Sequence, residues 1–108
     1  QQFDIPRWIK ENNEYLKWCI RGLVDTDGSV FSHKYKVNKK DYSYKKICFT
    51  SASSLLVKSV ATSLLKWGLK PRIARFGREV RLDSKENVSK YFYIVGSSNP
   101  KHLKRYKN

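Results

Sequence analysis

The sequence predicts an α+β fold in which helices cover one face of a four-stranded antiparallel sheet and leave the other face free. Two observations lead to this prediction. Apolar residues recur at helical spacing in two long segments, and the segments that follow them alternate residue by residue like strands. The elements follow in the order helix, two strands, helix, two strands, helix. A chain of 108 residues is long enough for one such domain, here residues 1–108.

Apolar spacing and capping residues place the helices. They are expected at about residues 5–9, 12–27, 53–67, 84–93 and from 100 onward. Asp4 is the candidate cap of the first short helix, Asn12 or Asn13 starts the second helix, and Ser53 is the cap of the long helix that Gly68 ends. The segment 12–27 carries a buried stripe of Tyr15, Leu16, Cys19, Ile20, Leu23 and Val24.

Strands are expected at residues 29–36 and 46–51 and in a hairpin over 71–82 that turns near residues 77–78. The first strand has two alternating faces, one with Phe31, His33 and Tyr35 and the other with Val30, Ser32 and Lys34. The segment 36–46 is polar, basic and rich in Tyr, so we expect it to be a long loop. Val80 and Leu82 form the inner face of the last strand.

The charge of the chain indicates an acidic partner. Lys and Arg number 23 against 9 Asp and Glu, which leaves a formal net charge of +14. Nucleic acid, an anionic membrane surface and an acidic protein all suit such a chain. No apolar run approaches the roughly 18 residues of a membrane span, and no signal-peptide pattern is present. Because basic and aromatic residues are interleaved along the whole chain, a folded nucleic-acid surface is favoured.

The two cysteines, Cys19 and Cys48, lie in apolar surroundings and lack the spacing of a zinc site. Buried free thiols are the simpler interpretation. They indicate an intracellular, reducing compartment such as the cytoplasm, the nucleoid or an organelle.

The segment 20–28 brings two carboxylates to the end of a helix. Asp25 and Asp27 there face the negative end of the helix dipole, which is unfavourable by about 0.3–1 kcal/mol each. A divalent cation would reverse the sign, and Mg²⁺ is usually held by one or two protein carboxylates with water and substrate phosphates. Gly28 is expected to end the helix in a left-handed conformation and free the Thr26 carbonyl for the same ion. A plain helix-to-strand turn is the alternative for this short segment.

The chain resembles the LAGLIDADG homing endonuclease family at the string IRGLVDTDG, residues 20–28. Residues 15–30 look like the motif helix of that family running into its first strand. The resemblance covers about residues 5–106 and implies an αββαββα half-domain with a saddle-shaped sheet. One departure is Arg21, where the motif has Ala.

In that family the motif helices of two half-domains pack together, and the last Asp of each motif binds metal at the scissile phosphates. The resemblance therefore implies that Asp27 and Thr26 bind Mg²⁺, with Mn²⁺ as a substitute and Ca²⁺ non-productive. It also implies a dimer interface on the motif helix at Trp18, Gly22 and Asp25. One motif supplies one of two required acids, so the chain is expected to act as a homodimer or as half of a two-motif enzyme.

Two further residues are implied as catalytic helpers. Lys101 matches a family lysine after the last strand and helix, which stabilises negative charge at the phosphate. A solvated basic tail is the alternative for this segment. Ser51 lies where relatives often place a polar residue that positions water, although Ser53 beside it is more simply a helix cap.

The free sheet face is expected to bind double-stranded DNA, because a two-stranded ribbon fits the major groove. The candidate contacts are His33, Lys34, Tyr35, Lys36, Lys45, Lys46, Arg72, Arg75, Arg78 and Arg81. Arg81 is the strongest of them, since Val80 and Leu82 fix it to the outer face. Solvated charges on an exposed sheet face are the alternative for any single residue.

The sequence thus predicts a sequence-specific DNA endonuclease that makes metal-dependent double-strand cuts in intron or intein homing. The alternative is a non-catalytic nucleic-acid binder, such as an RNA maturase for group I introns or a DNA-binding regulator. Asp27 favours the nuclease, because a pure binder has no electrostatic need for an acid facing phosphate.

Overall fold

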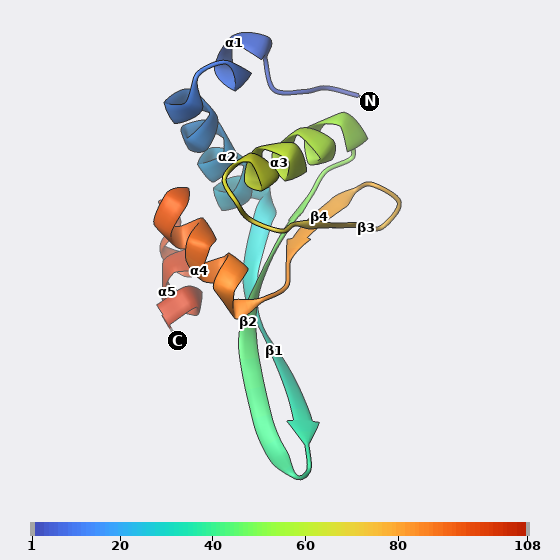
Figure 1. Ribbon diagram of the computed structural model, residues 1–108, viewed down its shortest axis with the longest axis vertical. Helices are drawn as coiled ribbons and strands as arrows, with labels where there is room; N and C mark the ends of the chain where they lie inside the picture. The colour runs from blue at the N-terminus through green and yellow to red at the C-terminus, as the bar shows by residue number, and fades with distance from the viewer. Residues whose placement is uncertain (1, 108) are drawn as a thin grey trace.

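The computed structural model describes residues 2–107 and has the predicted order of elements (Figure 1). The helices are α1 (Arg7–Lys10), α2 (Asn13–Asp27), α3 (Ser54–Lys66), α4 (Lys85–Ile94) and α5 (Pro100–Lys107). The strands are β1 (Gly28–Val37), β2 (Lys40–Thr50), β3 (Arg72–Ala74) and β4 (Glu79–Leu82). The α+β class and the αββαββα arrangement are therefore confirmed.

The four strands form one antiparallel sheet in the order β1-β2-β4-β3. Alternate residues of the strands point toward the helices, and these are Val30, Ile47, Phe49, Val80 and Leu82, each at most 3% exposed. They pack with the buried stripes of α2 and α3, which include Ile20, Val24, Val57 and Val60. Burial of each large apolar side chain contributes roughly 1.5–3 kcal/mol. Within residues 2–107 the helices pack on this face of the sheet, and the opposite face is free of helices, as predicted.

The segment 36–46 is strand, so its prediction as a long loop was wrong. The β1–β2 hairpin turns at Asn38 and Lys39 alone, whose φ angles of 52° and 66° are those of a tight two-residue turn. The hairpin runs beyond the helices, and it gives the molecule its 50 Å length (Figure 1). Because this part of the ladder covers no core, both of its faces can be polar, and the alternation that marks a strand is lost.

The β3–β4 hairpin turns at residues 75–78, close to the predicted position. Arg75, Phe76 and Gly77 have φ angles of 53°, 57° and 84°, and the Arg78 amide donates to the Arg75 carbonyl at 3.2 Å. Left-handed conformations of this kind are unfavourable for Arg and Phe. The turn therefore holds two large side chains in a strained loop at the outer edge of the sheet.

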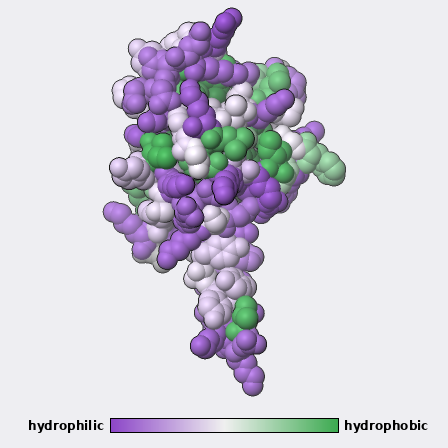
Figure 2. Space-filling view, in the orientation of Figure 1, coloured by the Kyte–Doolittle hydropathy of each residue, from purple (hydrophilic) through white to green (hydrophobic). Residues whose placement is uncertain are grey.

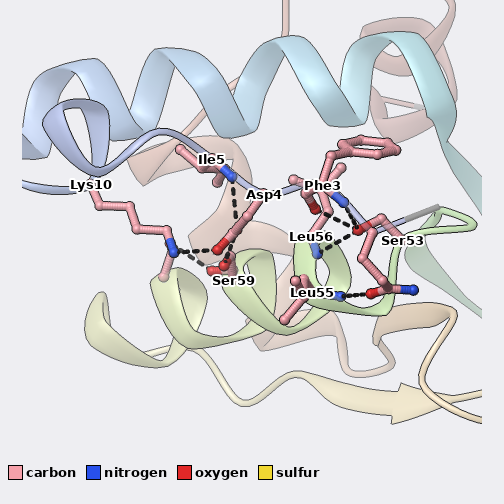
Figure 3. A network of polar contacts seen from close by, with 10 residues as sticks. Phe3, Asp4, Ile5, Lys10, Ser53, Leu55, Leu56 and Ser59 are labelled. Carbon is pink, nitrogen blue, oxygen red and sulfur yellow. Dashed lines mark hydrogen bonds and ion pairs between the residues drawn. The ribbon is translucent and has the colours of Figure 1, made fainter.

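The extended N-terminal segment is fastened to the start of α3 (Figure 3). Ser53 caps α3 as predicted, by accepting from the Leu56 amide at 3.3 Å, and it also exchanges hydrogen bonds with the Phe3 backbone. Asp4 is not the cap of α1, because that position is held by Pro6 and no side chain caps the helix. This part of the chain is held mainly by its contacts with α3.

Asp4 instead accepts three hydrogen bonds, from the Lys10 ammonium, the Ser59 hydroxyl and the Ile5 amide (Figure 3). Burial by itself would raise the pKa of the Asp4 carboxyl, but these three bonds outweigh it and lower the pKa below its usual value. The ionised carboxylate is thus the form that the fold stabilises.

The α2 helix is capped as predicted by Asn12, which accepts from the Tyr15 amide at 3.1 Å. Cys19 and Cys48 are both free thiols and partly buried. Within residues 2–107, the helices are too short or too polar for any of them to cross a membrane.

We predict that Asp4→Asn lowers the free energy of unfolding at pH 7 by about 1 kcal/mol, because it removes partly exposed charge-assisted hydrogen bonds. Since the pKa of Asp4 is lowered in the folded protein, this stabilisation is present above the unfolded pKa of about 3.9. It is lost as the pH falls through the folded value. Chemical denaturation of both proteins between pH 7 and pH 2 measures the difference.

The matched control is Glu11→Gln, because Glu11 pairs with Arg7 at 3.7 Å with both side chains largely exposed. Its effect should stay within about 0.5 kcal/mol at every pH. An Asp4→Asn effect no larger than that of the control would show that the N-terminal segment does not contribute to stability.

Candidate active site and nucleic-acid interface

Asp27, the predicted metal ligand, is the last residue of α2 and has an exposed side chain, as does Thr26. No ion pair found among residues 2–107 includes Asp27. The last turn of α2 contains no basic residue. The carboxylate therefore stands at the negative end of the helix dipole without compensation from its own chain.

Gly28 does not end α2 in a left-handed conformation, contrary to the prediction. Its φ and ψ are −97° and 177°, which is extended backbone that any residue can adopt. Glycine is required there by space. A Cβ atom would lie 2.6 Å from the Val24 carbonyl oxygen and 2.9 Å from that of Cys48. The helix thus passes directly into β1 where the backbone of β2 touches its last turn.

These residues fit a partial metal site. Within the described chain, no group of three or more His, Cys, Asp or Glu side chains is arranged to hold a metal ion. Asp27 offers one exposed carboxylate. Mg²⁺ commonly needs only one or two such ligands when phosphate and water complete its shell. An ion held by the Asp27 carboxylate and the neighbouring Thr26 carbonyl would therefore take its other ligands from water and phosphate.

The first motif aspartate, Asp25, forms hydrogen bonds with residues of its own chain. Its carboxylate accepts hydrogen bonds from the Ser97 hydroxyl at 2.5 Å and from the Ser98 amide at 2.7 Å. The Asn99 side chain donates to the Asp25 carbonyl at 2.8 Å. These bonds fix the segment between α4 and α5 to the end of α2. The carboxylate predicted for the dimer interface is thus directed into its own chain.

This tether brings the first turn of α5, and with it Lys101, to the end of α2. Lys101 is exposed, whereas the next residue, His102, is buried with its Nδ1 atom 3.6 Å from a carboxylate oxygen of Asp25. One turn later, Arg105 donates to the Val30 carbonyl at 3.5 Å. The α5 helix is thereby held against β1 with Lys101 on its outer side.

Ser51 lies at the end of β2, close to the point where β1 begins, because Gly28 pairs with Phe49 in the ladder. Its hydroxyl accepts from the Ser53 amide at 3.1 Å, which uses it in the entry to α3. Ser51 also lines an open hollow together with Thr50, Ala52, Arg75, Phe76 and Arg78. The structure thus gives Ser51 a local structural contact in addition to its position beside the hollow.

The outer face of α2 carries the other two residues predicted for a dimer interface. Trp18 is 65% exposed, and a Cβ atom added to Gly22 would meet nothing within 4 Å. Arg21, the departure from the motif, is turned away from this face. Its Nε donates to the Val95 carbonyl at 2.8 Å, at the end of α4. The residue that differs from Ala therefore does not obstruct the exposed stripe.

The open face of the sheet carries half of the predicted DNA contacts. Directly opposed residues of an antiparallel ladder share a face, and the register places His33, Tyr35, Lys46, Arg72 and Arg81 on the face opposite Val30, Ile47 and Val80. The outward placement of Arg81 is as expected. Arg75 and Arg78 lie in the β3–β4 turn at the edge of this face.

Lys34, Lys36 and Lys45 lie on the other face of the β1–β2 hairpin. Lys34 and Lys36 are both exposed, and Lys34 lines an open hollow together with residues of α4 and α5. The outer end of the hairpin extends beyond the helices, and its surface is largely hydrophilic (Figures 1 and 2). Lys45 is partly buried and donates to the Ser32 hydroxyl at 2.9 Å. The predicted cations thus surround the hairpin on both sides and do not form one plane.

An aromatic cluster on the hairpin was missed by the sequence analysis. Tyr35 and Tyr42 stack across the strands with ring centroids 5.4 Å apart, and Tyr44 lies 5.3 Å from His33. The Lys46 ammonium lies 5.4 Å from the Tyr44 ring centroid. The signal was the spacing of two between Tyr42 and Tyr44, which matches that of His33 and Tyr35. Such cross-strand contacts stabilise a ladder that has no core beneath it.

Two acid-centred clusters on the open face were also missed. Glu79, 3% exposed, lies 3.0 Å from the Nε of Arg75 and 3.1 Å from that of Arg81. Asp83 holds Arg72 at 2.7 Å and Lys46 at 3.4 Å. These four cations all belong to the predicted DNA-contact set. The pairs of Asp83 with Arg72 and Lys46 join different strands and cannot be read from a sequence until the register is known. Glu79 and Arg81 are two residues apart on β4, and this spacing was a signal that the sequence offered.

The Asp83 cluster is electrostatically strong. The hydrogen bond from Arg72 lowers the pKa of the Asp83 carboxyl, against the opposing effect of burial, and Lys46 adds to the lowering. The carboxylate is therefore ionised across the physiological range, and its two cations are held there by charge.

Comparisons with known proteins agree with this geometry. Residues 14–107 match the model of a family described as a LAGLIDADG-like domain. Among solved structures, the chain is similar to the LAGLIDADG homing endonuclease I-GzeII in complex with its DNA target. The TM-score is 0.54 and the identity 15%, over 83% of this chain and 28% of that one. No curated protein sequence matches the chain. At that identity the structural likeness shows the fold alone.

The two motif aspartates should differ in their effect on stability. We predict that Asp25→Asn lowers the free energy of unfolding by about 2 kcal/mol, because the Asp25 side chain is only 14% exposed and the variant weakens its charge-assisted bonds to Ser97 and Ser98. Asp27→Asn should leave it unchanged or raise it by about 0.3–1 kcal/mol, because it removes a charge at the unfavourable end of the helix dipole. Urea denaturation of the wild type and the two variants measures these differences. An equal loss of unfolding free energy in both variants would contradict the structural role of Asp25.

Proposed function

The chain belongs to the LAGLIDADG-like family, and from this premise we propose that it is a sequence-specific DNA endonuclease that makes metal-dependent double-strand cuts. The observation that supports this most is Asp27. It is an exposed carboxylate that forms no ion pair among residues 2–107, on the rim of an open sheet face rich in Lys and Arg. An acid costs binding energy on a surface that meets phosphate, so its position there favours chemistry over binding alone.

The proposed cofactor is Mg²⁺, with Mn²⁺ as a substitute and Ca²⁺ as a non-productive ion. The Asp27 carboxylate and the Thr26 carbonyl would hold it. Bound there, the ion would supply an activated water and stabilise charge on the leaving oxygen. Lys101, held near Asp27 by the Asp25 tether, would stabilise negative charge at the phosphate. Ser51 would help to orient water at the end of β2.

A double-strand cut needs two such sites, and each chain carries one motif. We therefore propose a homodimer in which the outer faces of two α2 helices meet, with Trp18 and Gly22 in the contact. Double-stranded DNA would then lie across both open sheet faces, as two symmetric half-sites. The same arrangement would follow if a second motif were supplied by a longer chain, since this chain spans 28% of the length of the I-GzeII chain. Cleavage of this kind suits intron or intein homing.

The nuclease is tested by comparing the wild type with Asp27→Asn on a random-sequence duplex DNA library. We expect Mg²⁺-dependent cleavage by the wild type and none with Ca²⁺. The variant should lose about a hundredfold or more of the rate, since it loses a group that acts on the developing charge. It should still bind DNA. Binding without cleavage by the wild type under every condition would instead favour a non-catalytic nucleic-acid binder, such as an RNA maturase or a DNA-binding regulator.

The homodimer is tested by Gly22→Leu. Because Gly22 is exposed and a Cβ atom there would meet nothing within 4 Å of its own chain, the fold should persist while the close approach of two helices is blocked. Sedimentation equilibrium should show at least about a tenfold weaker dimer, the size expected when a close contact is lost. Lys85→Leu, which adds the same side chain to an exposed position of α4, should leave the dimer intact. A wild type that is monomeric throughout would favour the two-motif arrangement.

A further inference from the structure

Two acids, Glu79 and Asp83, stand on a sheet face that is otherwise strongly cationic. Glu79 points to the open side of the sheet, because its neighbours Val80 and Leu82 point into the core. Its side chain is nevertheless only 4% exposed, under Arg75 and Arg81. A carboxylate on a surface that meets phosphate weakens general attraction to DNA. The presence of Glu79 and Asp83 on this face is therefore not explained by affinity for DNA.

The geometry of the Glu79 cluster shows what the acid does to its arginines. Both ion pairs use the Nε atom of the arginine, at 3.0 Å for Arg75 and 3.1 Å for Arg81. Arg75 donates a hydrogen bond from Nε to Glu79, whereas the Nε of Arg81 lies near the same oxygen as an ion pair and is buried without a hydrogen-bond partner. None of the hydrogen bonds found among residues 2–107 involves the terminal Nη atoms of these two arginines. Those terminal atoms are available for the bidentate contact that reads guanine. Glu79 thus holds the Arg75 guanidinium by a hydrogen bond and the Arg81 guanidinium by charge, in both cases at the inner nitrogen, and leaves the outer edges free.

Asp83, just after the end of β4, likewise contacts two cations of the sheet. It accepts from the Nε and, more weakly, the Nη2 of Arg72, at 2.7 and 3.4 Å, and it lies 3.4 Å from the Lys46 ammonium. Arg72 and Arg81 are directly opposed in the ladder. The two acids therefore hold neighbouring cations of β2, β3 and β4 in fixed directions.

We propose that Glu79 and Asp83 are positioning residues that set the sequence specificity of DNA binding, by holding Arg81, Arg75, Arg72 and Lys46 in place before DNA arrives. A long side chain that is already ordered loses less entropy when it contacts a base, and it is less able to adjust to a wrong base. The acids thus weaken binding to DNA of any sequence and increase the preference for the correct bases. This inference rests on the proposed DNA-binding function.

The chain contains a matched control. Asp41 is also an acid of the sheet, but its contact with Lys36 is 3.9 Å long and both side chains are about four-fifths exposed. Asp41→Asn, Glu79→Gln and Asp83→Asn each raise the net charge by one. Simple electrostatics therefore predicts the same effect on DNA binding for all three, whereas positioning predicts a difference.

The experiment first selects bound sequences from a random duplex library with the wild-type chain. It then measures Kd for the selected duplex and for a scrambled duplex, with the wild type and the three variants at one salt concentration. We expect equal or tighter binding of the scrambled duplex by every variant. The ratio of the two Kd values should fall about tenfold for Glu79→Gln and Asp83→Asn, the size of one lost base contact. It should change less than twofold for Asp41→Asn.

Each other outcome has a definite meaning. If all four proteins discriminate equally, or if Asp41→Asn loses as much as the other two, positioning is wrong while DNA binding stands. If the wild type selects no sequence, the proposed function fails and this inference fails with it. Thermal unfolding of each variant separates misfolding from lost positioning. Should the buried Glu79 prove necessary for folding, Asp83→Asn, at a more exposed site, decides by the same criterion.

Discussion

The junction between α2 and the sheet is the constraint on which the candidate site depends. At Gly28 the backbone of β2 comes so close to the last turn of α2 that a single added carbon would overlap both the Val24 and the Cys48 carbonyls. Because β1 begins at this residue, one contact sets both the end of the helix and the register of β1 against β2. A slip of one residue would turn the Val30 face of the strand toward solvent. The position of Asp27 and the composition of the open face are thus decided together.

The two aspartates of the motif have different surroundings although they are two residues apart. Asp25 is surrounded by donors from the segment that follows α4 and connects α2 to α5. Asp27 meets no such partner and stands exposed. A helix advances by about 100° per residue, so one carboxylate turns to α5 and the other to the rim of the sheet. The structural acid thereby supports the position of the exposed acid and of Lys101.

The cations of the sheet fall into two groups. Those on β3, β4 and the inner part of β2 are held by Glu79 and Asp83, over the core. Those on the projecting hairpin, such as Lys34 and Lys36, are exposed and weakly held. Held guanidiniums suit directional contacts, whereas mobile ammonium groups suit a charged backbone. The difference follows from the core: a rigid support exists under one group and not under the other.

The sequence by itself determined the order of the elements, the caps at Asn12 and Ser53, the inner faces of the strands and the family motif at residues 20–28. These are local features, because spacing and capping act within a few residues. Tertiary structure alone decided the rest. It turned residues 36–46 from an expected loop into a long hairpin, gave Asp4 and Asp25 partners more than 50 residues away, and required glycine at position 28 for space. It also brought Asp83 to Arg72 and Lys46. Each of these depends on contacts between segments that are far apart in the sequence. Local patterns of residues do not show such long-range contacts directly.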